Sequence, residues 1–537
     1  MSSAADSGRG AIVATAGTAA SRLTGFLRLG AMTFALGVAE SRLADTYNLA
    51  NTTPNILYEL VLGGILSSVL IRVYIQTRQN DGEGQAFEFI SRLTVVATLL
   101  LAAIALLGIV AAPWIFRLYT VLSPHSQLQQ EAGTFLLRLF VPQLVFYGLS
   151  TISTAVLNAH RRFGVPMFAP VLNNLAVTAT MIAFALLVPR PQRGLAGLPV
   201  QSLWLLGLGT TAGVALMGLI PWLSLRRIGY RLRRPATLRD ARFRTLAKLS
   251  AYMLGYVATN QAGLAVAMVL ANRVQGGVTA YQYAFVFFQL PHGLLAVSIA
   301  TAAFPLMTEK AVAGDYTGVA DVLNSSLRRT AFFVLPAIAG YLAIAPQLVK
   351  VLLEHGVATS ASTDLVATVL RAWAPGIFFF STFYVILRAF YSLGDTRTPM
   401  LINLGAFVVN VVVDLVLFVS FTDPAMRIAG LAIGHAASYA VASAAGAVML
   451  GRRLSRPVGW GWPALARTLA AAALTGGAAR LAASSVPAGG FTPTMGSVVV
   501  AISAGVAVYA LAARVLGLEE AKWIAGLIRR RPPVESG

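Results

Sequence analysis

The chain has 537 residues, of which 57% are hydrophobic and only 11% are charged. A soluble protein carries about 25% charged residues, so this composition excludes an ordinary soluble domain. Apolar runs of roughly 20 residues recur along the chain, and each is long enough to cross a hydrocarbon core of about 30 Å. Because the chain contains no cysteine, disulfides, thiol catalysis and thiolate metal sites are also excluded. We therefore predict an all-α polytopic membrane protein rather than a β-barrel, which would show alternating segments of about ten residues.

Fourteen candidate spans follow the polar N-terminus, which lacks a cleavage site and so predicts a retained first span. The expected spans are 11–38, 46–76, 87–112, 132–158, 166–188, 199–224, 245–272, 279–307, 327–345, 365–392, 399–421, 428–450, 463–483 and 495–516. The expected domains are an N-lobe at 1–225, a basic linker at 226–244, a C-lobe at 245–456, a pair of spans at 457–517 and an amphipathic tail at 518–537.

The net charge of +21 is concentrated in one set of connections between the spans. These basic positions are Arg161, Arg162, the linker at 226–244, Arg328, Arg329, Arg452, Arg453, Arg456, Lys522 and 529–531. The positive-inside rule predicts that this set and both termini are cytoplasmic. No nucleic-acid partner is expected, because the bases lie in short loops rather than on a folded basic face. The linker is expected to anchor the topology, with binding of anionic headgroups as the alternative.

An internal repeat supports two lobes of six spans each. The fourth span is followed by VLNAHRRFGVPMFAPVLNNL and the tenth by ILRAFYSLGDTRTPMLINLG, which share a basic turn and then Pro-Met at 166–167 and 399–400. A second match joins Pro54-Asn-Ile-Leu in the second span to Pro291-His-Gly-Leu in the eighth. Matches in corresponding places indicate a duplicated six-span unit with two spans appended.

The second span carries a line of polar residues at steps of three and four. Its members are Asp45, Asn48, Asn51, Asn55 and Glu59. This spacing places them on one helical face, and a polar face inside a membrane must meet a cavity or other helices. We interpret the line as the wall of a cavity, with hydrogen bonding between helices as the alternative.

The first span carries two arginines, Arg22 and Arg28, separated by about 120° around the helix and about 9 Å along it. Guanidinium groups bind phosphate with two parallel hydrogen bonds and stay charged at any relevant pH. The pair therefore indicates a phosphate-binding site. Pairing with Asp45 and Glu59 is the alternative interpretation, and the two can coexist.

Other polar residues stand alone in later spans. In the eighth span Gln289 and His292 flank a proline that bends helices, and a lone histidine there is more typical of a core residue than of a proton carrier. In the eleventh span Asn410 and Asp414, four residues apart, form a candidate cation-binding or protonation site. We find no phosphate loop, Walker motif or HExxH motif, and no carboxylate or histidine cluster at one membrane face. This favours a carrier over an enzyme.

These segments together resemble the MviN/MurJ family of lipid II flippases in the MOP exporter superfamily. The matching stretches, in chain order, are SRLTGFLR from Ser21, Ala44-Asp45, PNIL from Pro54, LNAHRRFGVPMFAPVLNN from Leu157, LPHGLLAVSIATAAFP from Leu290 and RAFYSLGDTRTPM from Arg388. The resemblance implies two six-helix lobes around a V-shaped cavity and a groove for the lipid tail beside the last two spans. It also implies that Arg22, Arg28 and Asp45 occupy cavity positions.

The chain also departs from the family pattern. An acid that follows the second arginine in many members is Leu29 here, and an arginine in the second span is Tyr58, followed by Glu59. In the eighth span, positions that are charged in the family are occupied by Phe285, Val286 and Gln289. The sequence of this span resembles that of actinobacterial members. The second lobe therefore lacks its share of the charged cavity.

The sequence as a whole leads to a lipid II flippase of the bacterial cytoplasmic membrane. Arg22 and Arg28 are expected to bind the diphosphate, the second-span residues and Gln289 the sugar-peptide head, and Asn410 with Asp414 a coupling Na⁺ or H⁺. No other cofactor is expected, the metal is not specified, and the expected partners are lipid II, membrane lipids and cell-wall synthesis proteins. The alternatives are an exporter of another polyprenyl-linked glycan or small molecule, and a cell-wall scaffold without transport activity.

Overall fold

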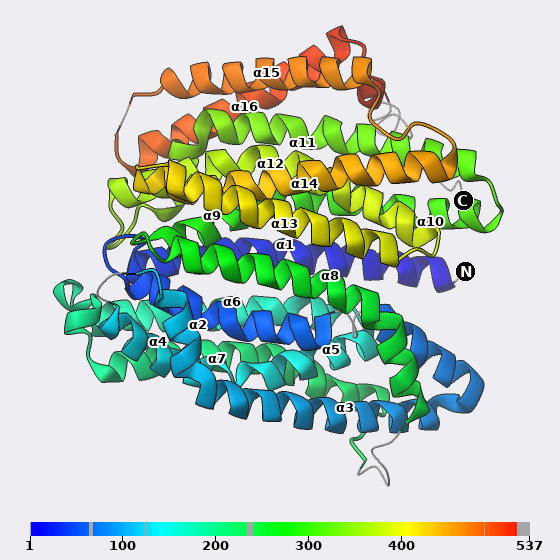
Figure 1. Ribbon diagram of the computed structural model, residues 1–537, viewed down its shortest axis with the longest axis horizontal. Helices are drawn as coiled ribbons and strands as arrows, with labels where there is room; N and C mark the ends of the chain where they lie inside the picture. Colours follow the sequence, from blue (N-terminus) through cyan, green and yellow to red (C-terminus); the bar gives the residue numbers. More distant parts are fainter. Residues whose placement is uncertain (1, 64–67, 124–125, 234–239, 488, 523–537) are drawn as a thin grey trace, which may run out of the picture. The chain divides into compact units, whose positions relative to one another are not determined.

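The computed structural model describes residues 2–63, 68–123, 126–233, 240–487 and 489–522, and all regular secondary structure in these ranges is helical (Figure 1). Within the same ranges, 11 helices are long and apolar enough to cross a membrane. The prediction of an all-α polytopic fold is confirmed. The chain packs as two compact units, the first formed by Met1–Thr279 with Leu353–Ser362 and the second by Ala280–Leu352 with Thr363–Gly537.

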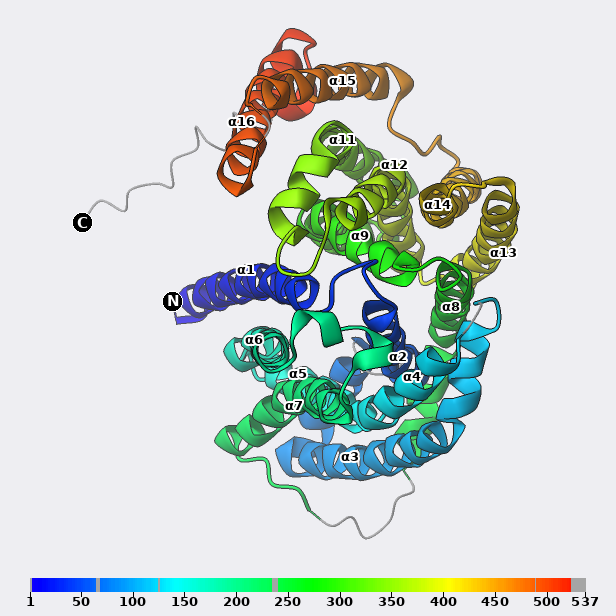
Figure 2. The ribbon, with the colours of Figure 1, turned by 90° about the vertical axis from the view of Figure 1, so that its left-hand side faces the viewer.

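The first unit contains eight α-helices and a π-helical turn among its described residues. They are α1 (Ser2–Leu36), α2 (Leu43–Tyr58), the π turn η1 (Glu59–Gly63), α3 (Ser68–Thr120), α4 (Gln127–Phe140), α5 (Gln143–Ala159), α6 (Gly164–Leu187), α7 (Val200–Ser224) and α8 (Ala241–Ala271). Short 3₁₀ turns lie at η2 (Arg190–Gln192), η3 (Leu195–Gly197) and η4 (Leu225–Ile228). Helix α6 packs against both α1 and α7, which places the first span beside the sixth helix (Figure 2).

The second unit begins within α9, and its helices follow in chain order. They are α9 (Gly277–Pro291), the π turn η5 (His292–Ala296), α10 (Val297–Val312), α11 (Tyr316–Leu353), α12 (Ser360–Ser392), α13 (Arg397–Ser420), α14 (Pro424–Leu454), α15 (Trp462–Ser484) and α16 (Phe491–Val515). Helices α13 and α14 form one closely packed pair, and α15 and α16 form another. The second pair rests on α11 through a small apolar core that includes Phe332, Ala471 and Ala512.

The helix boundaries agree with most of the expected spans, and the differences have local causes. The second expected span ends, and the third begins, within the single helix α3. This helix runs from Ser68 to Thr120 and is interrupted only at Gly82. Gly82 has φ 86° and ψ 168°, a conformation that only glycine adopts without strain. The fourth span is divided into α4 and α5 at Val141 and Pro142, where the proline cannot donate a helical hydrogen bond.

The prolines of the internal repeat occupy equivalent positions in their helices. Pro166 is the third residue of α6, and Pro399 is the third residue of α13. In the first turn a proline loses no needed hydrogen bond, since the first N–H groups of a helix have no partner within it. Pro54 lies within α2, which continues to Tyr58 before the π turn η1 begins, whereas Pro291 ends α9 and the π turn η5 follows it directly. A π turn therefore follows each proline, but it begins about one helical turn later in the first unit.

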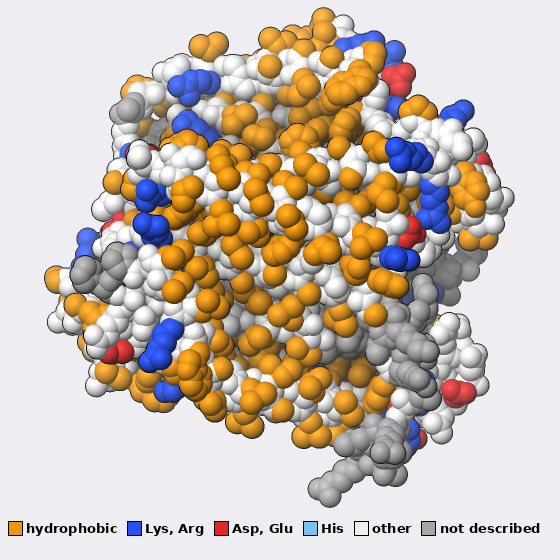
Figure 3. All heavy atoms as spheres, viewed as in Figure 1, with side chains coloured by type: hydrophobic (Ala, Val, Ile, Leu, Met, Phe, Trp, Pro, Cys, Tyr) orange, Lys and Arg blue, Asp and Glu red, His pale blue; other side chains and the backbone are white. Residues whose placement is uncertain are grey.

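The surface of the α13–α14 pair shows the charge pattern of helices that cross a membrane. Hydrophobic side chains cover the middle of these helices, and arginine side chains gather towards their ends (Figure 3). Arg397 begins α13, and Arg452 and Arg453 lie in the last turn of α14. The expected basic linker is described at 226–233 and 240–244, and α8 after it belongs to the first unit. Residues 523–537 of the expected tail lie outside the described residues.

Candidate functional site

The two arginines of α1 differ in their surroundings. Arg22 is exposed and Arg28 is half-buried. Neither side chain makes a hydrogen bond or ion pair with any residue that the structure describes. The positive charge of Arg28 reaches the hydroxyl groups of Tyr47 on α2 and Tyr147 on α5. A cation near hydroxyl groups and without a paired carboxylate is suited to bind a phosphate group.

Polar side chains of α2 and α5 continue this group, which we call the arginine–tyrosine cluster: Arg28, Asn51, Asn55, Tyr58, Tyr147 and Thr151. The side chain of Asn55 lies near the Tyr147 hydroxyl, which donates to Gln143 Oε1 at 3.4 Å, and the rings of Tyr58 and Tyr147 lie 5.3 Å apart. The hydroxyl of Tyr58 pairs with that of Thr151. These contacts place Asn55 of the predicted polar line beside α5, and Asn51 lies one turn before it on α2.

Asn51 supplies an unsatisfied acceptor within the cluster. Its Oδ1 is buried and has no hydrogen-bond donor among the described residues. Its backbone carbonyl accepts from Asn55 Nδ2 at 3.0 Å. A buried acceptor without a donor is costly, and binding sites are where such groups are found. The cluster can thus receive a ligand that brings both an anion for Arg28 and a donor for Asn51.

Asp45 and Asn48, at the start of the polar line, have a different role in this structure. Asp45 Oδ2 accepts from the Gly276 N–H at 2.7 Å, and Oδ1 accepts from the N–H and hydroxyl of Thr279 at 2.9 and 2.7 Å. Asn48 Nδ2 donates to the same Thr279 hydroxyl at 3.1 Å. These N–H groups lie at the start of α9, so Asp45 caps that helix. We call this group the Asp45 cap.

The Asp45 cap also bears on the alternative that the arginines pair with Asp45. The Asp45 carboxylate is fully buried and its oxygens accept three hydrogen bonds. The cation that acts on it is Arg42, whose Nη1 donates to the Asn272 carbonyl at 2.5 Å. Pairing of Arg22 or Arg28 with Asp45 is therefore absent in this conformation. A role for Asp45 and Asn48 in holding the head of a substrate remains a prediction that requires the cap to open.

Two further residues, Glu59 and Gln289, were predicted to contact the substrate. Glu59 is half-buried and begins the π turn η1. Gln289 is half-buried on α9, in the second unit. Their roles remain predictions.

Asn410 and Asp414 meet on α13 as their spacing predicts. Asn410 Nδ2 donates to Asp414 Oδ1 at 3.1 Å, and the Asp414 side chain is buried. Gly434 of α14 presses against this carboxylate, since a Cβ at that glycine would lie 1.9 Å from Asp414 Oδ1. A buried carboxylate with so few donors is stabilised by a bound cation or a proton. The described residues contain no cluster of three or more metal-ligating side chains of the His, Cys, Asp and Glu types.

The loop between α1 and α2 contains a carboxylate that the sequence reasoning missed. Glu40 Oε1 accepts from the N–H of Thr359 and from the hydroxyls of Thr359 and Ser362 at 2.5–2.9 Å, and Oε2 accepts from the Val38 N–H at 2.6 Å. Burial alone raises the pKa of Glu40, but the hydrogen bonds outweigh it and hold the pKa below its ordinary value. We call this group the Glu40 clasp, which joins the loop to the segment Leu353–Ser362 of the same unit.

The tyrosines of the cluster were also missed as site residues. Tyr147 and Thr151 are one turn apart on α5, within an apolar segment that looks like an ordinary core helix. The only available signal was that spacing, combined with Tyr58 at a position where the family resemblance places an arginine. Their hydroxyls became informative only once α2 and α5 were seen to pack together.

Comparison with known proteins places the chain among transporters. Residues 34–501 match the family model described as "Lipid II flippase MurJ". The "Lipid II flippase MurJ" of Burkholderia cenocepacia is 27% identical over 401 residues, covering 73% of this chain and 75% of that protein. The "Probable lipid II flippase MurJ" of Rhizobium meliloti is 26% identical, covering 78% of this chain and 76% of that protein.

Solved structures agree with this assignment at the level of the fold. A structure titled "Lipid II flippase MurJ, inward closed conformation" matches with a TM-score of 0.75 and 20% identity, covering 94% of this chain and 99% of that one. An inward-facing multidrug resistance MATE family transporter of the MOP superfamily matches with a TM-score of 0.64 and 14% identity, over 81% of this chain and 94% of that one. The fold is thus that of a multi-pass membrane transporter. Because the family model covers most of its length, the chain belongs to the lipid II flippase MurJ family.

Proposed function

We propose that this protein is a transporter that moves lipid II from the inner to the outer leaflet of the bacterial cytoplasmic membrane. Membership of the family supports the substrate, and the arginine–tyrosine cluster supports a site for its diphosphate. The observation that carries the proposal is Arg28, a half-buried cation whose charge reaches the Tyr147 hydroxyl and which has no carboxylate paired to it within the described ranges. An exporter of another polyprenyl-linked glycan would share the diphosphate, so the two differ in the sugar-peptide head.

The test is complementation of a bacterium depleted of its own lipid II flippase, with leaflet accessibility of lipid II measured in the same cells. We expect the wild type to restore growth and outward movement of lipid II. Arg28→Ala is expected to fail, Arg28→Lys to restore part of the activity because it keeps the charge but not the paired hydrogen bonds, and Arg22→Ala to weaken it.

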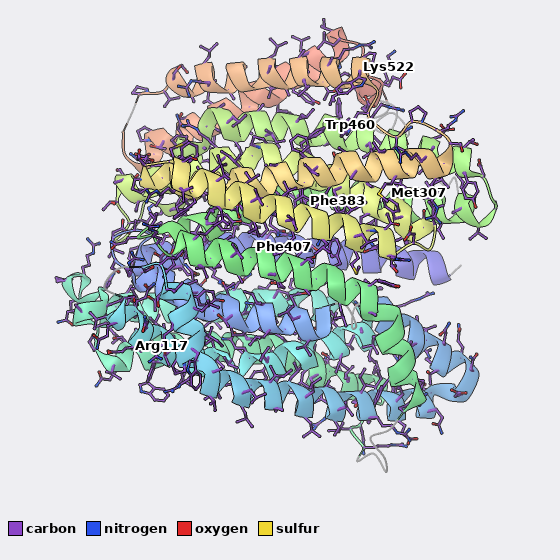
Figure 4. The ribbon with its side chains drawn as sticks, in the orientation of Figure 1. Arg117, Met307, Phe383, Phe407, Trp460 and Lys522 are labelled. Carbon is purple, nitrogen blue, oxygen red and sulfur yellow. The ribbon has the colours of Figure 1, made fainter. Side chains whose placement is uncertain are left out.

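Arg117→Ala is the matched control, because Arg117 is an exposed arginine on α3 of the same unit (Figure 4). It should support growth like the wild type. If the wild type fails to move lipid II, the substrate assignment fails and export of another polyprenyl-linked glycan or a scaffold role takes its place. If well-expressed Arg28→Ala works as well as Arg117→Ala, the diphosphate site is not at Arg28.

We propose that Asn410 and Asp414 couple transport to a cation or a proton. Support comes from the buried Asp414 carboxylate, which receives a side-chain hydrogen bond from Asn410 and is closely covered by Gly434. In proteoliposomes, wild-type transport should respond to an imposed Na⁺ or H⁺ gradient, and Asp414→Asn should remove that response. Asp364→Asn, at an exposed carboxylate on α12, is the control that should retain it.

We propose that both termini face the cytoplasm, as the basic connections indicate. The absence of cysteine in the chain allows single-cysteine labelling with a membrane-impermeant maleimide. In intact cells or spheroplasts, Gln192→Cys should be labelled and Arg231→Cys should not, although both positions are exposed. Labelling of Arg231→Cys alone would reverse the orientation.

A further inference from the structure

A cavity of about 420 Å³ lies in the second unit where α15 begins, and neither the arginine–tyrosine cluster nor the Asn410–Asp414 pair contributes to it. Its polar lining comes from Arg328 of α11, Trp460 before α15, Arg467 of α15, and Glu519 and Glu520 after α16. Figure 4 shows Trp460 and Lys522 on the side of the unit where α15 starts. The cavity therefore combines three separate segments of the chain.

The walls of this cavity are fixed by hydrogen bonds outside it. Asn324 Nδ2 donates to the Pro457 carbonyl at 3.0 Å, and Asn324 Oδ1 accepts from the Gly459 N–H at 2.9 Å. Arg456 Nη1 pairs with Asp321 Oδ1 at 3.0 Å. The connection that carries Trp460 is thus fastened to α11, and the Trp460 ring packs on Phe378 at 5.1 Å. Such a pre-formed wall is what a specific small-ligand site requires.

Within the cavity, one cation is already neutralised and another is not. Arg328 Nε lies 3.7 Å from Glu520 Oε1, whose side chain is only 9% exposed. Arg467 is exposed and makes no hydrogen bond or ion pair with a residue in the described ranges, and the same holds for Glu519. The site therefore offers one unpaired positive group and one unpaired negative group.

Two further donors favour a phosphate near Arg467. Trp460 Nε1 is buried and has no acceptor in the described part of the chain. Helix α15 begins at Trp462, and Gly461, Pro463 and Ala464 line the cavity, so the positive end of the dipole of this 23-residue helix lies beside it. An indole N–H, a guanidinium and a helix N-terminus all favour a bound anion, which accepts their hydrogen bonds.

The position of the cavity matches the depth of lipid headgroups. Trp462, beside the cavity on α15, is 80% exposed, and exposed tryptophans mark membrane–water interfaces. Leu469, two turns further along α15, is exposed as expected for a helix in contact with lipid. A ligand here meets both the acyl region and the aqueous boundary.

We infer that this cavity binds the headgroup of a phosphatidylethanolamine-type phospholipid, with its phosphate on Arg467 and Trp460 and its ammonium on Glu519. Two cations and two carboxylates line the site, so a headgroup that carries both charges fits better than a bare anion. This inference does not depend on the proposed function, since the lipid is a resident of the membrane and not the transported substrate.

The test uses the purified full-length protein in detergent and dihexanoyl phosphatidylethanolamine as the probe. Binding is followed by the shift in Tm and independently by tryptophan fluorescence, whose change on adding the lipid should disappear in Trp460→Phe. We expect saturable binding that Arg467→Gln and Glu519→Gln each weaken by about ten-fold or more, because each removes a charge-assisted hydrogen bond. Arg480→Gln, at an exposed arginine near the other end of α15, is the matched control and should bind like the wild type.

The choice of lipid separates the alternatives. Dihexanoyl phosphatidylcholine should bind at least about ten-fold more weakly, since its quaternary ammonium cannot donate a hydrogen bond to Glu519. Inorganic phosphate and dihexanoyl phosphatidylglycerol should also bind more weakly than dihexanoyl phosphatidylethanolamine. Equal binding of phosphatidylcholine or phosphatidylglycerol would overturn the zwitterionic assignment, and equal binding of inorganic phosphate would show a free-phosphate site instead. An identical loss of affinity in Arg467→Gln and Arg480→Gln would show that the lipid does not bind in this cavity.

Discussion

Two buried aspartates, one in each unit, are held in opposite ways. Asp45 receives three hydrogen bonds, two of them from backbone N–H groups at the start of α9. Asp414 receives one from the Asn410 side chain and is pressed by the backbone of Gly434. Two similarly buried carboxylates therefore differ in their hydrogen bonding. The one in the first unit is saturated with hydrogen-bond donors, and the one in the second unit is undersupplied with them. The first is suited to hold structure together, and the second is suited to exchange a cation or proton.

The contrast predicts that substitution of Asp45 mainly lowers stability, whereas substitution of Asp414 mainly affects the coupling of transport to an ion. Loss of a saturated carboxylate leaves buried donors without an acceptor, which costs more than the net value of the hydrogen bonds. Loss of an undersupplied carboxylate removes a costly charge and few hydrogen bonds. The free energy of unfolding, measured in detergent, is the scale on which the following four changes should differ.

The largest effect is expected for Asp45→Ala. The Gly276 and Thr279 N–H groups lose their acceptor, at about 1–3 kcal/mol for each buried group. The Tm should fall well below that of Asp364→Ala, in which an exposed carboxylate is removed. Equal Tm values for the two variants would show that the Asp45 cap does not stabilise the first unit.

Gly434→Ala is expected to destabilise by about 1–3 kcal/mol, because its new Cβ must displace the Asp414 carboxylate. Gly405→Ala, on α13 with open space around its Cβ position, should instead leave stability unchanged or slightly raise it. Adding Asp414→Ala to Gly434→Ala should restore much of the lost stability. A double variant no more stable than Gly434→Ala would contradict the close contact.

Glu40→Gln should lower the free energy of unfolding by about 1 kcal/mol near neutral pH, since a neutral amide accepts weaker hydrogen bonds. The pKa of Glu40 is held below its ordinary value of 4.5, so its stabilisation is complete above that pH and is lost as the pH falls through the lowered pKa. The difference between wild type and variant should therefore shrink below about pH 4.5. A difference that is independent of pH would rule out the charged clasp.

The smallest change in stability is expected for Asp414→Asn, within about 1 kcal/mol of the wild type. The same variant should lose its response to an ion gradient in the proteoliposome assay. A large loss of stability with coupling intact would reverse the proposed roles of the two aspartates.

The helices and the positions of prolines at their starts were predicted well from the sequence, because both depend on local chemistry. Apolar length and prolines such as Pro166 and Pro399 act within a single helix, and the structure places both in first turns. The Asn410–Asp414 contact was also local, since four residues span one helical turn.

The Asp45 cap could not be predicted, because its donors lie 231 and 234 residues away in the chain. A polar line at helical spacing shows that Asp45 and Asn55 share a face, but not what each residue meets along that face. Asn55 meets Tyr147 and Asp45 meets the start of α9, so one line serves two purposes. The tyrosines were missed because aromatic residues in apolar helices are ordinary core residues until a neighbouring helix supplies a polar partner.

The π turns after Pro54 and Pro291 each have the form of a single-residue insertion in an α-helix. One inserted residue rotates everything beyond it by about 100° relative to the preceding helix. The amide face of α2 therefore cannot continue past Glu59 in the same direction, and the face of α9 changes direction likewise at His292. Removing one residue from η5 would therefore realign α10 with α9 and turn every side chain of α10 by the same angle.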